Sequence, residues 1–186
     1  QAVVDRARRM VIRDRNHACV CIWSLGNEAG DGENFKYMKQ AILYHDDSRP
    51  VHYEGDFDLT TSDFISRMYP NGEMMEKLGT RQPITVSMFE NIANSLAADN
   101  KPITAEMYRG KPVVLCEFAH AMENSLGNFQ EFMDAFEKYD NLCGGFIWDF
   151  VDQAIHKKEN GVDKWLYGGD FDEGATSGYF CANGII

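Results

Sequence analysis

The feature that most constrains this chain is a short apolar run that ends in chemically active residues. Residues 20–25, Val-Cys-Ile-Trp-Ser-Leu, are mostly apolar, aromatic or sulfur-bearing, which predicts a strand buried on both faces. Beyond the run, Asn27 and Glu28 bring an amide and a carboxylate to the edge of the sheet. A second apolar run, residues 112–116, ends in Glu117. Sites in α/β folds are built at the carboxyl ends of strands, so we expect both glutamates at one rim.

Strand-like and helix-like patterns alternate along the chain. Apolar residues at helical spacing predict helices over residues 1–13, 34–46, 74–78 and 128–139, and a further one is possible over 88–98. Strands are expected over residues 20–28, 51–54, 64–69, 112–117 and 144–149, and the Gly- and Asp-rich remainder is expected to be loop. Alternation of this kind predicts parallel βα units.

The predicted fold class is α/β, as a partial TIM (β/α)8 barrel comprising about the last five strands with their helices. Polar residues end several strands: Glu28, Glu54, Tyr69, Glu117 and Asp149. A closed barrel has eight strands and typically about 250 residues, whereas this sequence has 186. The first helix begins without a start signal, so the domain is expected to begin before residue 1.

Composition excludes some classes of partner. The chain carries 29 acidic and 18 basic residues, a formal charge of -11, which argues against binding to nucleic acid or to an anionic membrane. Five cysteines form no Cys-x-x-Cys pair, and three of them lie in apolar strand-like runs. An odd number of thiols that look buried favours a reducing compartment over a disulfide framework. Without a signal peptide or a spanning segment, the expected location is cytoplasmic.

Paired carboxylates suit glycosidic-bond hydrolysis with retention. One carboxylic acid protonates the leaving oxygen while the other carboxylate attacks the anomeric carbon, and the two lie about 5–5.5 Å apart. Asn27 could donate to a neighbouring sugar hydroxyl, and Trp148 could offer an apolar platform to a pyranose. Other roles stay open: a strand-end glutamate can cap a helix or form an ion pair, Trp148 can be core, and His120 can be a structural hydrogen-bonding group.

Several long motifs carry a family resemblance. The segments Arg13-Asp-Arg-Asn-His and Ile22-Trp-Ser-Leu-Gly-Asn-Glu are followed by Leu115-Cys-Glu-Phe-Ala-His-Ala-Met, Gly144-Gly-Phe-Ile-Trp-Asp-Phe-Val-Asp-Gln and Tyr167-Gly-Gly-Asp. Together with the closing Phe180-Cys-Ala-Asn-Gly, they resemble glycoside hydrolase family 2, and within it the large β-galactosidases. The resemblance extends over nearly the whole chain. It implies that residues 1–186 are the C-terminal portion of a TIM-barrel catalytic domain.

The resemblance implies a role for each matching residue. Glu28 would be the general acid/base and Glu117 the nucleophile, in an enzyme of carbohydrate metabolism that hydrolyses terminal β-D-galactosides through a covalent galactosyl-enzyme. The residues implied to bind substrate are Asn27, Tyr69, His120, Trp148 and Asn183. Glu28 would also contact magnesium, and the Phe180 carbonyl and Asn183 would help to hold sodium. A homo-oligomer is expected.

Two departures and two alternatives accompany the resemblance. Glu123 stands where the family has glycine, and Ala18 where a proline is usual. The family's other metal ligands precede residue 1, so neither cation is expected at a full site in this chain, and the chain alone is expected to be inactive and to self-associate. The alternatives are another family 2 β-glycosidase, acting on glucuronides or mannosides, and a non-catalytic carbohydrate-binding module.

Overall fold

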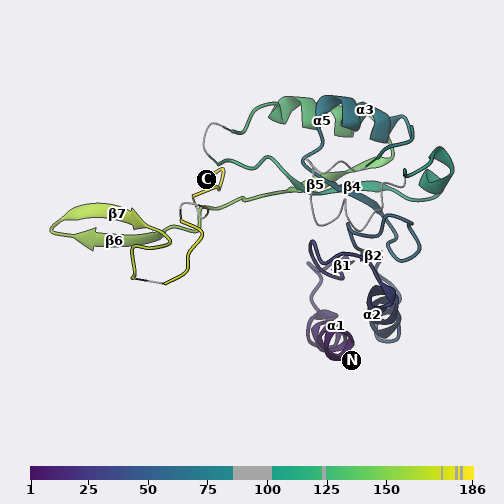
Figure 1. Ribbon diagram of the computed structural model, residues 1–186, viewed down its shortest axis with the longest axis horizontal. Helices are drawn as coiled ribbons and strands as arrows, with labels where there is room; N and C mark the ends of the chain where they lie inside the picture. Colours follow the sequence, from purple (N-terminus) through teal and green to yellow (C-terminus); the bar gives the residue numbers. More distant parts are fainter. Residues whose placement is uncertain (86–101, 123–124, 173, 179, 181) are drawn as a thin grey trace.

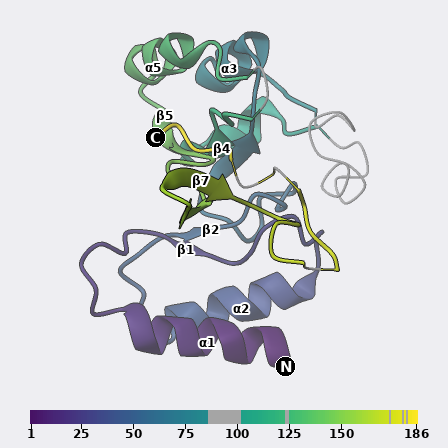
Figure 2. The same cartoon turned by 90° about the vertical axis from the view of Figure 1, so that its left-hand side faces the viewer.

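The strands of this protein lie between two pairs of helices. The computed structural model describes residues 1–85, 102–122, 125–172, 174–178, 180 and 182–186. Figures 1 and 2 show helices α1 (Ala2–Asp14) and α2 (Glu33–Leu43) on one side of the strands, and α3 (Gly72–Gly79) and α5 (Phe129–Lys138) on the other. The helix possible over residues 88–98 lies outside the described residues.

Five strands run parallel and follow one another in chain order. Strand β1 (Trp23–Ser24) pairs with β2 (Val51–His52), and a second sheet has the order β3 (Ile65–Met68), β4 (Val113–Phe118), β5 (Leu142–Ile147). Helices cover their outer faces, as in a β/α barrel, but the described strands do not close into one. The prediction of about five barrel strands with their helices is therefore confirmed.

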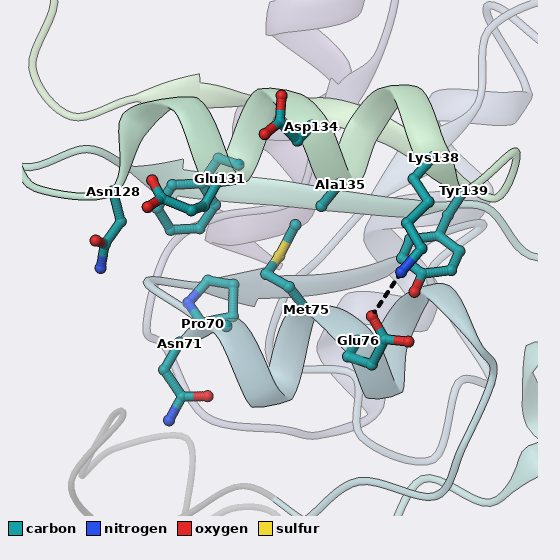
Figure 3. A pocket seen from close by; sticks show the side chains of 12 residues that line it. Pro70, Asn71, Met75, Glu76, Asn128, Glu131, Asp134, Ala135, Lys138 and Tyr139 are labelled. Carbon is teal, nitrogen blue, oxygen red and sulfur yellow. Dashed lines mark hydrogen bonds and ion pairs between the residues drawn. The ribbon is translucent and has the colours of Figure 1, made fainter.

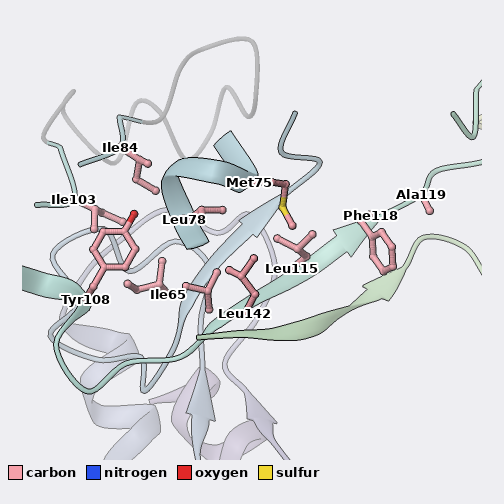
Figure 4. Packing of buried hydrophobic residues seen from close by; sticks show 11 residues of the cluster. Ile65, Met75, Leu78, Ile84, Ile103, Tyr108, Leu115, Phe118, Ala119 and Leu142 are labelled. Carbon is pink, nitrogen blue, oxygen red and sulfur yellow. The ribbon is translucent and has the colours of Figure 1, made fainter. Parts of the chain in front are cut away.

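The two sheets have separate apolar cores. Val11 of α1 and Ile42 of α2 are fully buried against Trp23 and Val51, which explains the apolar face predicted for the first helix. The larger core joins α3 and α5 to β3, β4 and β5, with Leu78, Ile65 and Leu115 at its centre (Figure 4). Each pair of helices thereby fixes the strands that it covers.

The first strand is shorter and less buried than predicted. Trp23 and Leu25 are buried, but Ser24 between them is exposed, so the expectation of burial on both faces was wrong. The expectation of buried thiols was also wrong: Cys19, Cys21 and Cys143 are exposed and Cys116 is half-buried, while Cys181 lies outside the described residues. The apolar composition of residues 20–25 did not predict their burial correctly, because only Trp23 and Ser24 pair with β2.

The segment after β5 is not all loop. Strands β6 (Ile155–Glu159) and β7 (Val162–Leu166) form an antiparallel hairpin that projects from the body in Figure 1. Asn160 and Gly161 connect them, both with positive φ (51° and 82°), as a two-residue type I′ turn requires. The Asn-Gly pair was the sequence signal for this hairpin. No helix in the described part of the chain is long and apolar enough to cross a membrane.

Candidate active site

A break in strand pairing positions Glu117. In the β3–β4 ladder Arg67 faces Leu115, but the next residue, Met68, faces Glu117, so Cys116 is an extra residue on β4. The β4–β5 register shifts over the same stretch. Bulges bend a strand and redirect its side chains, and they are frequent beside active sites. Glu117 thus lies at the carboxyl end of β4 on an irregular stretch of strand.

Tyr69 is the direct partner of Glu117. Its hydroxyl donates to Glu117 Oε2 at 2.6 Å, and its backbone N–H donates to the Glu117 carbonyl at 3.0 Å. Burial, this hydrogen bond and the Glu117 charge all raise the pKa of Tyr69. The phenol therefore stays protonated at neutral pH and can serve as a donor to the carboxylate.

Glu28 lies within electrostatic range of the same phenol. Its negative charge contributes to the raised pKa of Tyr69, after the larger effects of burial and Glu117. Glu28 itself is exposed, as is Asn27 beside it. The rim thus holds two carboxylates that follow different strands, and the protonated phenol of Tyr69 is hydrogen-bonded to one of them, Glu117.

Aromatic contacts extend the site from Tyr69 towards the end of the chain. The rings of Tyr69 and His120 lie 5.8 Å apart, and those of His120 and Phe180 lie 5.3 Å apart. On the other side of β4, the backbone N–H of Trp148 donates to the Phe118 carbonyl at 2.9 Å. Trp148 is 38% exposed. Trp148 is therefore not a core residue, whereas Trp23 is.

The backbone around the site is strained. Glu28, Tyr69 and Ala119 have φ values of 46°, 45° and 57°, in the left-handed region that residues with side chains rarely adopt. Tyr69 and Ala119 directly follow β3 and β4, and Glu28 comes four residues after β1. Strained backbone persists where the surrounding structure holds it, and it gathers at active sites.

The loop that carries Glu28 is fixed at both ends by polar contacts. Before it, the Trp23 indole donates to the buried carboxylate of Asp46 at 2.9 Å, and Arg49 donates to the Val20 carbonyl at 2.7 Å. After it, the Tyr53 hydroxyl donates to the Gly30 carbonyl. Strand β1 is only two residues long, so these contacts supply much of its anchorage.

Of the residues expected to hold cations, Asn183 fits best. Asn183 is fully buried, and neither its amide oxygen nor its amide nitrogen has a hydrogen-bond partner among the described residues. An unsatisfied buried oxygen suits a hard cation such as sodium. For magnesium the described residues do not fit: they contain no group of three or more His, Cys, Asp or Glu side chains that could hold a metal.

One polar line was missed by the sequence interpretation. The ring of His52 on β2 contacts Ser24 Oγ at 3.1 Å through Nδ1, and Ser66 Oγ at 2.7 Å through Nε2. These residues belong to β1, β2 and β3, and two of them are buried. Their spacing in the sequence gave no signal, because only the register of the strands brings them together.

A groove on the helical side lies apart from the rim. It has a volume of about 400 Å³ and runs between α3 and α5, with Met75 and Phe132 among its lining residues and an ion pair between Lys138 and Glu76 at 3.2 Å (Figure 3). No predicted site residue lines it. The groove therefore takes no part in the chemistry of the two glutamates.

Known proteins match this chain along its whole length or nearly so. The sequence profile described as "Glycosyl hydrolases family 2, TIM barrel domain" matches residues 1–186. A β-galactosidase of Pectobacterium atrosepticum is 42% identical over 187 residues, which is 100% of this chain and 17% of the relative. One of Klebsiella pneumoniae is 42% identical over 97% of this chain and 16% of the relative. The chain thus spans about a sixth of the length of these relatives.

Solved structures with a similar arrangement are more distant. The crystal structure of Ruminococcus gnavus β-glucuronidase aligns with a TM-score of 0.49 and 20% sequence identity, and covers 84% of this chain and 30% of that one. A complex of the same glucuronidase with an N1-substituted uronic isofagomine gives a TM-score of 0.47.

Proposed function

The chain belongs to glycosyl hydrolase family 2, to its TIM barrel domain, and on that premise we propose that it carries both catalytic carboxylates of a retaining β-galactosidase. The contact from Tyr69 to Glu117, with Glu28 in electrostatic range of the same phenol, is the observation that carries the proposal. We further propose that residues 1–186 are the C-terminal portion of the barrel domain of a longer protein, referred to below as the intact enzyme.

Glu117 is proposed as the nucleophile. Its carboxylate attacks the anomeric carbon of the galactoside and forms a covalent glycosyl-enzyme, while Glu28 in its acid form donates a proton to the departing oxygen. Tyr69 holds one oxygen of Glu117 by its hydrogen bond, which orients the other oxygen towards the sugar. Glu28 then takes a proton from water, and the activated water releases galactose with its configuration retained.

The remaining rim residues are proposed to bind the sugar. Asn27, next to the acid/base, donates to the hydroxyl beside the reacting carbon, and His120, whose ring lies against those of Tyr69 and Phe180, contacts further hydroxyls. Trp148 offers its partly exposed face to the apolar side of the galactose ring. Asn183, whose backbone carbonyl accepts from the Asp149 N–H at 3.1 Å, is proposed as a further sugar-binding residue.

Cations would add to this arrangement in the intact enzyme. The buried amide oxygen of Asn183 and the carbonyl of Phe180 would hold sodium, which would help to bind a sugar hydroxyl. A full magnesium site at Glu28 needs ligands beyond those that the described residues offer. We also propose that the intact enzyme is cytoplasmic, acts in carbohydrate metabolism and forms a homo-oligomer.

Variants of the two glutamates in the intact enzyme test the assignment. Glu117→Gln should abolish nearly all turnover, whereas Glu28→Gln should impair galactosides with poor leaving groups far more than those with activated ones, since a good leaving group needs little protonation. Azide should restore activity to Glu28→Gly on an activated substrate and give a β-galactosyl azide. Rescue of a Glu117 variant with the same stereochemistry would reverse the assignments.

A substrate panel tests the galactoside assignment. Chromogenic β-galactosides, β-glucuronides and β-mannosides offered to the intact enzyme should give the highest kcat/KM with the galactoside. A preference for the glucuronide or mannoside would identify another β-glycosidase of the family. Binding of galactose without turnover of any of them would identify a carbohydrate-binding module.

A further inference from the structure

The two candidate catalytic glutamates are carried by different sheets. Glu28 follows β1 in the β1–β2 sheet, and Glu117 lies on β4 in the β3–β4–β5 sheet. Strands β2 and β3 share no strand pairing in the described parts of the chain, and a backbone bond from Asp63 N to the Val51 carbonyl (2.8 Å) joins them at their amino-terminal ends. The Asp63 carboxylate and the Ser62 hydroxyl also accept from the N–H groups of Val51 and Tyr53, at 2.7 and 3.1 Å. The side chain of His52 adds a link between the strands themselves.

The side chain of His52 spans that junction. Its ring contacts Ser24 Oγ on β1 at 3.1 Å and Ser66 Oγ on β3 at 2.7 Å. Burial lowers the pKa of His52 to about 4, so the ring is neutral at pH 7, with one donor nitrogen and one acceptor nitrogen. Each serine hydroxyl can act as donor or as acceptor, so the hydrogen bonds to Ser24 and Ser66 can form at once.

The line continues to the strand of the proposed nucleophile. The thiol of Cys116 on β4 donates to the carbonyl of Arg67, the residue after Ser66, at 3.6 Å. Cys116 is the residue before Glu117, and Ser24 stands four residues before Glu28. Hydrogen bonds of His52 therefore join β1, β2 and β3, and the stretch of β3 that holds Ser66 contacts the strand of Glu117 through Cys116.

From this geometry we infer that His52 is a positioning residue that sets the separation of the Glu28 and Glu117 carboxylates. The inference rests on the proposed function. The ring contacts Ser24 and Ser66, so it acts through the strands that these serines belong to. Displacing a catalytic group by about 1 Å can cost on the order of 100-fold in rate, so a loose junction between the sheets should appear in kcat.

Three variants of the intact enzyme separate positioning from general destabilisation. His52→Leu removes both bonds and should lower kcat on an aryl β-galactoside by about 10- to 100-fold, with KM within about twofold. His52→Gln keeps a donor and an acceptor on one planar group and should recover most of that loss. Val51→Ala is the matched control, because Val51 is buried next to His52 but packs into the helix-covered core; it should lower Tm and leave kcat nearly unchanged.

The serines provide a second test that does not depend on the histidine variants folding. Ser66→Ala removes the bond that crosses the junction and should lower kcat about as much as His52→Leu. Ser24→Ala removes only the bond that orients the ring from within its own sheet and should lower kcat less. The double variant should lose little more than Ser66→Ala alone, because orienting the ring has no effect once the bond across the junction is gone. If the losses in kcat of the two single variants multiply in the double variant, the serines act separately and the inference is overturned.

Other outcomes are equally decisive. If His52→Leu keeps wild-type kcat, or loses no more than Val51→Ala at equal loss of Tm, His52 does not position the glutamates. Failure of the proposed function is distinguishable, because Glu117→Gln would then keep its activity, and the role of His52 would fall with it. A normal loss in Glu117→Gln with an unaffected His52→Leu would overturn the positioning role alone.

Discussion

At the scale of single residues, the contact between Tyr69 and Glu117 is central to the site. A protonated phenol held 2.6 Å from a carboxylate oxygen fixes the carboxylate in one orientation. The hydroxyl stays a donor because burial and two negative charges raise the pKa of Tyr69. The left-handed φ of Tyr69 (45°) carries its side chain back over the end of β4 rather than along β3.

Replacing Tyr69 by phenylalanine should remove the hydrogen bond that orients the Glu117 carboxylate. A hydrogen bond to a charged group contributes about 1.5–3 kcal/mol, so kcat of Tyr69→Phe in the intact enzyme should fall about 10- to 100-fold. Tyr108→Phe is the control, since the Tyr108 hydroxyl is buried without a partner among the described residues and lies outside the site. Equal kcat values for the two variants would contradict the role of Tyr69.

The buried His52 predicts a dependence of stability on pH. Its pKa falls from 6.5 in the unfolded chain to about 4 in the folded one, so the unfolded chain binds more protons between these values. The stabilisation is complete above pH 6.5 and is lost as pH falls towards 4. Between pH 7 and pH 4.5, wild type should lose about 2 kcal/mol more unfolding free energy than His52→Gln, as measured by denaturant titration. Parallel pH curves would contradict this.

At the scale of elements, the sequence predicted the type and order of most strands and helices. Periodicity located α1, α2, α3 and α5, because each buries an apolar stripe. It overestimated β1, since composition cannot tell which residues of an apolar run find a partner strand. It missed the β6–β7 hairpin, whose strands mix charged and apolar residues without alternation and have no buried face.

The same limit applies to the candidate site. Local motifs predicted both glutamates, because Glu117 follows an apolar run directly and Glu28 comes three residues after the end of another. The bulge at Cys116 and the line through His52 depend on register between strands that are distant in the sequence. Register is fixed by packing, so no pattern in one strand could reveal it.

The close pairing of β4 and β5 can be tested at a glycine. A Cβ added to Gly145 would lie 2.8 Å from Leu115 Cβ and 2.9 Å from the Leu115 carbonyl oxygen. Overpacking of this kind costs about 1–3 kcal/mol, so Gly145→Ala should lower the free energy of unfolding by that amount. Gly127→Ala, where an added Cβ meets nothing within 4 Å, is the control and should change stability little. Equal stability of the two variants would contradict the pairing.

At the scale of the whole molecule, the described strands form an open arc. Strands β1 and β5 each pair on one side only within the described residues, whereas every strand of a barrel pairs on both. Phe146, Trp148 and Phe150 are exposed on or just after β5. Open edges with apolar side chains favour pairing with another copy.

A polypeptide of residues 1–186 alone should therefore self-associate and lack galactosidase activity. Light scattering at several concentrations, run beside a galactoside assay, measures both properties. The intact enzyme serves as the active reference. A monomer at every concentration that also hydrolyses the galactoside would contradict this expectation.

The most direct test of the account is to trap the covalent intermediate on the intact enzyme. A 2-deoxy-2-fluoro-β-galactoside with an activated leaving group should form the glycosyl-enzyme and release it slowly, because the fluorine destabilises the oxocarbenium-like transition state. Peptide mapping by mass spectrometry should then find one fluorogalactosyl group on Glu117, and none in Glu117→Gln. A label on Glu28, or on any other residue, would contradict the assignment of the two carboxylates.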